Sequence, residues 1–552
     1  MHPYCKGTIR PIRLLVQPRV CVFSAKDDGL DPPIRQETMY SSPLALARQL
    51  PFLAPSYAKA CATVTTAVHA KSAGARLEQS RMSFSYSTSP RLPRTSDPSF
   101  QHDRRTLLTS AAETALAYLD GEDHRPVAPA EEAVAALAEF RELLPETPSH
   151  ADEVLGLLAR VAQPATVSKT AGRNFGFVNG GCLPASLAAS WLVSAWDQNA
   201  SFFVQSPAAV TLEEVALGWV VDLLGLPRDT AGAVVTGATM ANFTALAAAR
   251  HQLLARAGWN VEEEGLYGAP ELKVVVGEEV HASVIKALGL LGLGRKRVSR
   301  VPVDAQGRMR PDQLPALDDR TILILQAGNV NTGAFDPADE ILPKAKAAGA
   351  WVHVDGAFGL WVRSSAQLRH LAEGFEKADS WATDGHKWPN VGYDCGIALV
   401  RDGDALRSAM AIRAAYLSLA DEHREPTDYN PELSRRARGV ELWAALRQMG
   451  RSGMAGIVET TSRHARSFAL GLRHAGFEIL NNVVLNQVLV SFGTPEQTLA
   501  IIDRIQKDGT CWCGSTVWQG RTAMRISVSS WATTDEDVER SLEAILRAAG
   551  RS

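Results

Sequence analysis

The stretch "WATDGHKWPNVGYDCG" at residues 381–396 decides the fold, because it places a histidine-lysine pair just before the apolar run GIALV. A lysine beside a buried strand costs free energy unless its charge is paired or its amine is used chemically. Lys387 either extends its ammonium to solvent at a sheet edge, as most lysines do, or is an amine of lowered pKa that reacts with a carbonyl group. The rest of the chain has to distinguish these two interpretations.

Short apolar runs alternate with helical stretches from residue 208 onward. The runs GAVVT, KVVVG, TILILQ and AWVHVDG are separated by amphipathic segments such as ANFTALAAARHQLLARAG. This alternation is typical of an α/β domain with a mainly parallel sheet. Beyond about residue 432, the runs VVLNQVLVSF and AMRISVSS precede the helical stretch TDEDVERSLEAILRAAG. They predict a smaller C-terminal α+β domain.

The N-terminal part of the chain differs in composition from the rest. The first hundred residues hold 11 of the 29 prolines, and no Asp or Glu precedes Asp27. Residues 1–103 therefore cannot bury a core, and we expect a disordered extension or leader there. Amphipathic spacing in RRTLLTSAAETALAYL and AEEAVAALAEFRELL predicts an N-terminal helical segment at 104–207. We place the large α/β domain at 208–431 and the small C-terminal domain at 432–552.

The start of the chain also bears on location in the cell. Its acid-free, arginine-containing sequence resembles an organellar transit peptide, although the prolines in RPIRLLVQPR make a poor amphipathic helix. In the alternative interpretation translation starts at Met82, since MSFSYSTSPRLPR has the character of a short flexible leader. We expect a cytoplasmic protein, with organellar import by the N-terminal extension as the alternative.

The overall composition excludes several classes of function. With 46% apolar and 21% charged residues, the chain is ordinary for a soluble globular protein. A net charge of -3 gives no reason to expect nucleic acid or an anionic membrane as a partner. The seven scattered cysteines fit no disulfide framework or zinc spacing, so we expect no metal site. No apolar run reaches the roughly 18 to 20 residues of a membrane-spanning helix.

Ligands of open α/β sheets bind at the carboxyl ends of the strands, so the residues after each apolar run are candidates. GATMAN at 237–242 is a tight turn that opens a helix, where free N–H groups and the Thr239 hydroxyl suit a phosphate group. His281 follows KVVVG, Asp355 follows AWVHV, and Lys387 follows ADSWAT. Each has a structural alternative, such as a plain turn or a helix-capping histidine.

Taken together, these strand ends offer a phosphate turn, an aromatic ring, a carboxylate and an amine. Pyridoxal 5'-phosphate needs this set: a phosphate anchor, a ring stacked on the pyridine, an acid at the pyridine nitrogen and an amine for the aldehyde. The combination favours the chemical interpretation of Lys387.

The sequence resembles the group II pyridoxal-phosphate-dependent decarboxylases, the relatives of glutamate and aromatic amino acid decarboxylases, over about residues 105–545. The motifs that carry the resemblance are FGFVNGGCLPASLAASWL, LEEVALGWVVDLLGLP, TGATMANFTALAAAR, EEVHASVIKALGLLG, AGNVNTGAFDP, VHVDGAFG, DGHKWPNVGYDCG and ELSRRARGVELWAALR. The resemblance implies fold type I, as in aspartate aminotransferase. It also implies an obligate homodimer with active sites at the interface, and Lys387 as the lysine that forms a Schiff base with the cofactor.

The resemblance also assigns roles to residues around the cofactor. Asp355 is expected to pair with the pyridinium nitrogen, and Ala357 is the small residue beneath the ring. His281 is expected to stack on the opposite face of the ring. Ala238 and Thr239 are expected to bind the phosphate through a backbone N–H group and a hydroxyl group.

The remaining expectations concern one position that matches the family and two places that depart from it. His386 is expected beside the phosphate. Asp384 is Asn in part of the family, and a carboxylate near a phosphate needs a bridging donor or points away. The family often has two Ser or Thr residues where this chain has Asn329, Val330 and Asn331, so the contacts of that loop stay open.

A long polar segment at 410–433 separates GIALV from the next helix and is expected to be a mobile lid. It contains Tyr416, which is similar to the catalytic-loop tyrosine of the family's decarboxylases, whereas related aldehyde synthases carry phenylalanine there. The resemblance makes Tyr416 the acid that protonates the substrate Cα after carbon dioxide leaves. In the alternative interpretation it is a packing aromatic.

The expected reaction is the decarboxylation of an L-amino acid to its amine and carbon dioxide. Phe175 and Phe177 lie in a region that lines the pocket of the family, which favours an aromatic or apolar substrate. Glutamate needs a dedicated cation, and the sequence does not single one out. Arg435 is instead interpreted as a structural anchor near the cofactor.

Three alternatives remain open at this stage. In the first, the chain is an aldehyde synthase. In the second, it is an aminotransferase-like relative that binds the substrate carboxylate through Arg525, and in the third it is a homologue without activity. Retention of Lys387, Asp355, His281 and Tyr416 argues against the last of these.

Overall fold

The computed structural model describes residues 104–412 and 423–551, which belong to one compact unit of the chain. The predicted disorder of residues 1–103 and the predicted role of Tyr416 lie outside the described residues. The proposed division of the chain after residues 207 and 431 remains a prediction.

A seven-stranded sheet forms the centre of this unit, with the strand order β1-β7-β6-β5-β4-β2-β3. Strands β6, β5, β4, β2 and β3 run parallel to one another, and β7 pairs antiparallel with both β1 and β6. The mainly parallel sheet expected from the sequence is confirmed. The strands are β1 Ala231–Val235, β2 Lys273–Gly277, β3 Val298–Val301, β4 Thr321–Gln326, β5 Trp351–Asp355, β6 Ser380–Asp384 and β7 Gly396–Val400.

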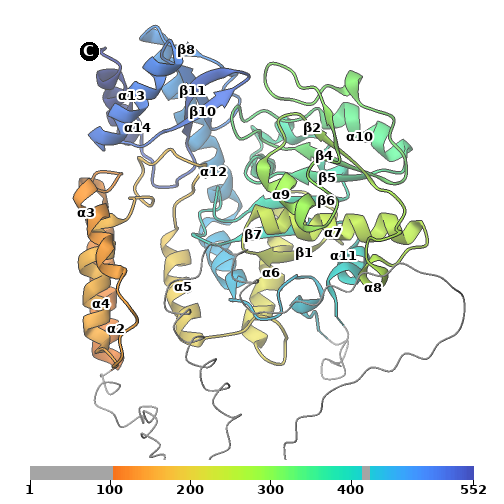
Figure 1. The fold of residues 1–552 in the computed structure, drawn as a ribbon, viewed down its shortest axis with the longest axis horizontal. Helices are drawn as coiled ribbons and strands as arrows, with labels where there is room; N and C mark the ends of the chain where they lie inside the picture. Colours follow the sequence, from red (N-terminus) through yellow and green to blue (C-terminus); the bar gives the residue numbers. More distant parts are fainter. Residues whose placement is uncertain (1–103, 413–422, 552) are drawn as a thin grey trace, which may run out of the picture. The chain divides into compact units, whose positions relative to one another are not determined.

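Both faces of this sheet are covered, as Figure 1 shows. In β4, Ile322 and Ile324 pack in the core shared with α7 and α9, while Leu323 and Leu325 pack in the core shared with α6, α10 and α12. Side chains alternate between the faces of a strand, so an unbroken apolar run fits a strand buried on both sides. The helices around the sheet are α6 Pro207–Leu223, α7 Ala238–Arg256, α8 Val261–Glu264, α9 Ala282–Leu290, α10 Ala338–Ala347 and α11 Gly403–Met410.

The C-terminal part contains a four-stranded antiparallel sheet of order β10-β11-β9-β8. Its strands are β8 Glu478–Ile479, β9 Gln487–Ser491, β10 Gly514–Trp518 and β11 Arg521–Ser527, and it packs with α13 Pro495–Asp508 and α14 Asp535–Ala548. Capping boxes at Thr494 and Thr534 fix where the two helices begin. The smaller α+β part expected from the sequence is present.

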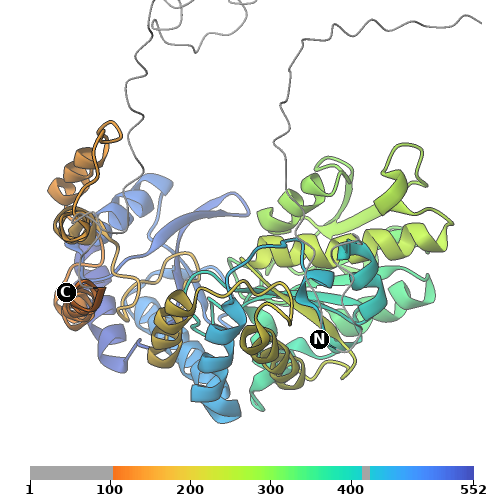
Figure 2. The same ribbon diagram turned by 90° about the horizontal axis from the view of Figure 1, so that it is seen from below.

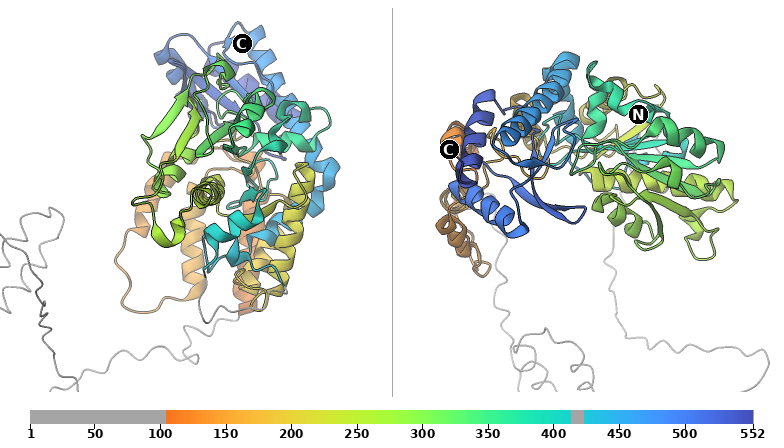
Figure 3. Two further views of the ribbon diagram at one scale, coloured as in Figure 1. Left: turned by 90° about the vertical axis from the view of Figure 1, so that its right-hand side faces the viewer. Right: turned by 90° about the horizontal axis from the view of Figure 1, so that it is seen from above.

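Helix α12, Arg438–His474, connects the two sheets. It breaks at Gly450, whose φ of 59° is easily adopted by glycine. It packs on α5 and α6 and also contacts β8, β9 and α14. In the view from above in Figure 3, the blue C-terminal elements lie on one side of the molecule and the green strands on the other.

In the described part of the chain, five α-helices precede β1 of the large sheet: α6 and, before it, α2 Arg104–Asp120, α3 Glu131–Ala136, α4 Ala151–Leu157 and α5 Pro184–Trp196. Figures 1 and 2 show α2, α3 and α4 close to the C-terminal elements. The backbone of Val127 donates to Gly509 O at 2.8 Å at this junction. Among the described residues, no helix combines the length and the apolar character needed to cross a membrane.

Candidate active site

The predicted site residues lie at the carboxyl ends of four strands of the large sheet. Ala238 begins α7 after β1, and His281 caps α9 after β2. Asp355 ends β5, and Lys387 follows β6, the neighbour of β5 in the sheet. Asp355 and Lys387 thus follow neighbouring strands, and the charges of both act on the pKa of His281.

Lys387 is paired inside the protein. Its Nζ lies 3.2 Å from Asp384 Oδ2, and its side chain is 16% exposed. The ring of Phe358 lies on another side, with its centroid 5.8 Å from Nζ. The interpretation of Lys387 as a lysine that extends to solvent at a sheet edge therefore does not hold.

Asp355 is a carboxylate that lacks a close cation. It is buried, and its Oδ1 accepts a hydrogen bond of 3.3 Å from Ala357 N. Burial raises the pKa of Asp355, while the charges of His281 and Lys387 counteract the shift. Among the residues that the structure describes, no cation comes within ion-pair distance of this carboxylate. A protonated ring nitrogen would compensate it.

His281 is held by the first turn of α9. Its Nδ1 accepts a hydrogen bond of 3.2 Å from Ser283 N and lies 2.7 Å from Ser283 Oγ. An Nδ1 that accepts from a backbone N–H places the ring proton on Nε2. The residue as a whole is exposed, yet partial burial of the imidazole lowers the pKa of His281, which favours the neutral ring at neutral pH. A fixed, neutral ring fits the predicted stacking role.

The predicted phosphate turn precedes α7. Its residue Gly237 packs directly on Gly396 of β7, where a Cβ would lie 2.4 Å from Gly237 Cα. Only glycine at position 396 permits this approach. Ala238 N donates a 2.6 Å hydrogen bond to Asp384 Oδ1, and Thr239 lies in the same first helical turn. The alternative in which Asp384 points away from the turn is excluded.

His386 lies behind this turn. It is buried, its Nδ1 accepts from Cys395 N at 3.3 Å, and its ring stacks on Tyr393 with centroids 4.4 Å apart. Its Nε2 lies 3.6 Å from Asp384 Oδ2. Burial lowers the pKa of His386, so a neutral ring with its proton on Nε2 faces the carboxylate.

The loop at residues 329–331, which departs from the family pattern, is held by its own side chains. Asn329 Oδ1 accepts from the backbone N–H groups of Asn331 and Thr332, at 2.9 and 3.2 Å. Asn331 Oδ1 accepts from Thr516 Oγ1 at 2.9 Å and from Arg525 at 3.4 Å. The loop thus positions Arg525 of β11 near the site, where its charge lowers the pKa of His281.

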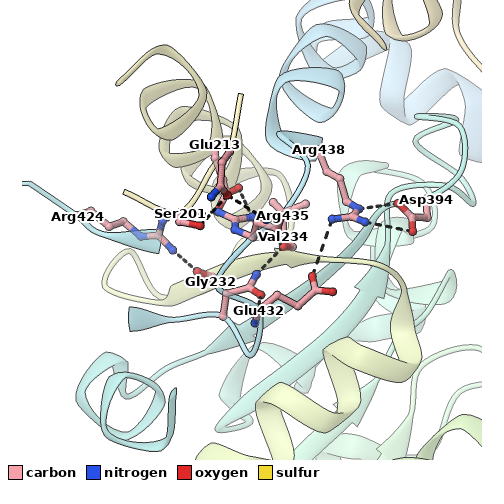
Figure 4. A network of polar contacts seen from close by, with 11 residues as sticks. Ser201, Glu213, Gly232, Val234, Asp394, Arg424, Glu432, Arg435 and Arg438 are labelled. Atoms are coloured by element: carbon pink, nitrogen blue, oxygen red, sulfur yellow. Dashed lines mark hydrogen bonds and ion pairs between the residues drawn. The ribbon is translucent and has the colours of Figure 1, made fainter. Parts of the chain in front are cut away.

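Arg435 supports the strand that leads to the phosphate turn, as expected from the sequence. Figure 4 shows its fully buried guanidinium group paired with Glu213 of α6, at 2.8 and 2.9 Å. The same group donates to Val234 O in β1, and Arg424 donates to Gly232 O. The network joins α6, β1 and the segment after residue 423 behind the site.

The prediction for the two phenylalanines is wrong for one of them. Phe175 is 1% exposed and packs in the core of the C-terminal sheet, with its ring centroid 5.0 Å from that of Phe468. Phe177 is 69% exposed and stacks on Trp512 at 5.2 Å. The backbone of Phe175 is fixed at the small sheet, because its N–H group donates to Trp512 O just before β10 and its carbonyl accepts from Ser527 N of β11.

Two further residues near the site were missed by the sequence analysis. Tyr393 donates its hydroxyl hydrogen bond to Asn179 Oδ1, and this contact joins the 381–396 stretch to the loop that contains Phe177. The two residues are 214 positions apart, so no sequence spacing indicates the contact. The same loop touches the site at Gly180, where a Cβ would lie 2.0 Å from Lys387 O.

Comparison with known proteins gives the family. The model of the pyridoxal-dependent decarboxylase conserved domain matches residues 136–494, well over half of the chain. The chain belongs to this family. It is a pyridoxal-phosphate-dependent carboxy-lyase that acts on an amino acid.

Individual relatives are distant. Tryptophan decarboxylase 1 of Oryza sativa subsp. japonica is 27% identical over 65% of this chain and 77% of its own length. L-2,4-diaminobutyrate decarboxylase of Rhizobium meliloti (strain 1021) is 28% identical over 65% and 74%. Acidic amino acid decarboxylase GADL1 of Mus musculus is 30% identical, over 52% of each protein. These relatives act on different amino acids by name, so they do not fix the substrate.

Solved structures confirm the fold. Oryza sativa TDC with PLP and tryptamine has a TM-score of 0.75 at 23% identity, covering 81% of this chain and 97% of that chain. Mouse CSAD has a TM-score of 0.74 at 22% identity, covering 81% and 98%. The large sheet with its smaller C-terminal part is therefore fold type I, as the resemblance implied.

The described residues fit the cofactor of this family. Asp355 offers a buried carboxylate without a close cation, and Lys387 an amine at the end of the neighbouring strand. Pyridoxal phosphate, when bound, supplies an aldehyde for the amine and a ring that accepts the electron pair left at the substrate Cα. In the roles that the family resemblance implies, Asp355 would keep the ring nitrogen protonated and His281 would stack a neutral aromatic face against the ring. Ala238 and Thr239 would supply N–H and hydroxyl donors for the phosphate.

Proposed function

We propose that this decarboxylase converts an L-amino acid with an aromatic or apolar side chain to the amine and carbon dioxide. The observation that carries the proposal is a group of exposed aromatic rings at the loop that packs against the backbone of Lys387. Phe177 and Tyr393 are 69% and 59% exposed, and Phe177 stacks on Trp512. Phe177 belongs to the loop that touches Lys387 O through Gly180, and Tyr393 is hydrogen-bonded to Asn179 of the same loop. Exposed rings of this kind favour an apolar or aromatic ligand.

The similarity to aromatic decarboxylases supports the same substrate class. Besides the rice tryptophan decarboxylase, aromatic-L-amino-acid decarboxylase of Bacillus atrophaeus is 27% identical over 56% of this chain. A screen of the purified protein against the twenty amino acids for carbon dioxide release tests the proposal. Release confined to phenylalanine, tyrosine, tryptophan or aliphatic amino acids supports it, and release from glutamate or aspartate alone contradicts it.

A second candidate, an acidic substrate, rests on Arg525. Its guanidinium group donates to two neutral groups, Val330 O and Asn331 Oδ1, at 3.3 and 3.4 Å. Among the described residues, no carboxylate lies within ion-pair distance of Arg525, so it can receive a carboxylate of the substrate. Arg525→Met separates the two roles. Loss of turnover for every amino acid indicates binding of the α-carboxylate, and loss confined to acidic amino acids indicates a side-chain site.

Product analysis separates the decarboxylase from its rivals. Amine plus carbon dioxide is expected. Aldehyde with ammonia and peroxide would instead identify an aldehyde synthase, and a keto acid would identify an aminotransferase-like enzyme. The predicted acid Tyr416 supports the amine product through the family resemblance alone.

We further propose a homodimer in the cytoplasm. Support for the dimer comes from apolar side chains exposed around the N-terminal helices, with Leu143 and Leu144 93% and 91% exposed. These helices also border a cavity of about 1210 Å³ that reaches Trp191 and Trp531. For the location, a fluorescent fusion of the full chain is compared with a fusion that begins at Met82. Cytoplasmic signal from both supports the proposal, and organellar signal from the full chain alone contradicts it.

A further inference from the structure

Asp384 contacts two groups that pyridoxal phosphate needs: the N–H group of Ala238 for its phosphate and the amine of Lys387 for its aldehyde. Its Oδ1 accepts the N–H group of Ala238 at 2.6 Å, and its Oδ2 lies 3.2 Å from Lys387 Nζ. The side chain is 3% exposed, so water does not share these contacts. One carboxylate therefore joins the phosphate turn to the amine.

The cofactor has to take over both contacts. A backbone N–H group has one hydrogen to donate, so Ala238 N cannot fully serve Asp384 and a phosphate oxygen together. A dianionic phosphate beside an ionised carboxylate is also repelled. The amine of Lys387 has to lose a proton and its ion pair before it can attack an aldehyde.

We propose that Asp384 competes with pyridoxal phosphate for Ala238 and Lys387, and so sets how tightly and how fast the enzyme takes up its cofactor. The proposal concerns the loading of the cofactor and is independent of which amino acid is the substrate. Asp384 thus acts as a positioning residue that weakens cofactor binding.

The surroundings of Asp384 leave its side chain a second place to bind. Its backbone is fixed, since Asp384 N donates to Ala357 O at 3.0 Å and its carbonyl accepts from Trp361 Nε1 at 3.2 Å. The carboxylate, however, lies 3.6 Å from His386 Nε2. Because Cys395 N donates to His386 Nδ1, the proton of this ring is on Nε2 and faces Asp384. A small rotation toward His386 therefore releases the other two groups while keeping the carboxylate bonded.

The full-length enzyme, stripped of cofactor with hydroxylamine, tests the proposal by titration with pyridoxal phosphate. Asp384→Asn keeps the size of the side chain and removes its charge. We expect affinity to increase about 10-fold, the effect of losing one charged contact, because the amide oxygen still accepts from Ala238 N but no longer pairs with the ammonium of Lys387 or repels the phosphate. The control is Asp394→Asn, which alters the same stretch but pairs with Arg438 and not with Ala238 or Lys387. It should leave affinity unchanged.

Two partial ligands separate the contacts. Inorganic phosphate probes Ala238 alone, and pyridoxal, which lacks the phosphate, probes Lys387 alone. Asp384→Asn should strengthen inhibition of cofactor uptake by phosphate and should speed the covalent attachment of pyridoxal. Unchanged or weaker binding of all three ligands by Asp384→Asn overturns the proposal, because Asp384 would then help to hold the cofactor. If this variant does not fold, Asp384→Ser provides the same comparison.

Discussion

At the scale of single residues, burial decides which side chains can take part in the chemistry. Asp355 and Asp384 are both buried carboxylates near Lys387, yet they have opposite surroundings. Asp384 has an ammonium group at 3.2 Å and an N–H group at 2.6 Å, whereas Asp355 has one backbone contact of 3.3 Å. A buried carboxylate without a partner is stabilised most by a new cation. This difference favours the predicted role of Asp355, and not Asp384, as the partner of a protonated ring nitrogen.

Asp355→Asn is therefore expected to retain the cofactor and lose most activity. An amide cannot hold the proton on the ring nitrogen, so kcat should fall by at least about 100-fold, as for loss of one key electrostatic group. Absorbance of bound cofactor and the rate of carbon dioxide release measure the two effects separately. Turnover close to that of the wild type would show that this carboxylate has another role.

At the scale of elements, the strand ends that carry the site are fixed by buried polar contacts on both sides of the sheet. On one side, His353 of β5 joins Asn242 of α7 and Ser380 of β6, at 2.8 and 2.9 Å. On the other side, Glu213 of α6 holds Arg435 behind β1. His353 lies two residues before Asp355 at the end of β5, and Arg435 bonds to Val234, one residue before the end of β1. Both contacts therefore link the stability of the fold to the geometry of the site.

The His353 contact predicts a dependence of stability on pH. Burial lowers the pKa of His353 to about 3, from 6.5 for an unperturbed histidine. Between these values the unfolded chain binds a proton that the folded chain does not, so stability is full above pH 6.5 and falls as the pH is lowered. At pH 5 the loss from this residue is about 2 kcal/mol. His353→Gln should be less stable at pH 7 but should lose less between pH 7 and pH 5, as measured by urea unfolding. An equal loss in both proteins would contradict the assignment.

The Glu213 contact predicts a large loss of stability on neutralisation. Glu213→Gln leaves Arg435 buried without its charge partner, and such a change costs about 3 to 5 kcal/mol. Asp222→Asn on the same helix is the matched control, because it breaks the exposed pair with Arg451, which contributes about 0 to 1 kcal/mol. Thermal unfolding compares the two variants. Equal effects would show that the buried network does not stabilise β1.

The sequence predicted those parts of the site that depend on strand ends. Lys387, Asp355 and His281 follow apolar runs, and parallel strands bring their carboxyl ends to one edge. The contact between Asp384 and Ala238 could not be predicted, since it depends on a side-chain rotamer and joins residues 146 positions apart. Phe175 was misplaced because the loop before α5 pairs with the small sheet, a contact that no spacing within the loop indicates.

At the scale of the whole molecule, the N-terminal helices leave an apolar surface that the described unit does not cover. Leu108 and Leu116 of α2 are 59% and 51% exposed, and Leu158, which follows α4, is 46% exposed. Residues eight apart lie on one face of a helix. Large apolar side chains left exposed on one helix favour a contact with another protein. The proposed homodimer gives this surface a partner of the same sequence.

This surface leads to a prediction about assembly. In sedimentation equilibrium the wild type should have twice the mass of one chain. Leu108→Glu combined with Leu116→Glu places two charges on the apolar face of α2, so the dimer should dissociate, and activity should fall with it if the site lies at the interface. Leu499→Glu is the control, because this leucine is also 49% exposed but lies on α13. A double variant that remains a dimer would show that α2 does not take part in the interface, and a control that dissociates would place the interface at the C-terminal part instead.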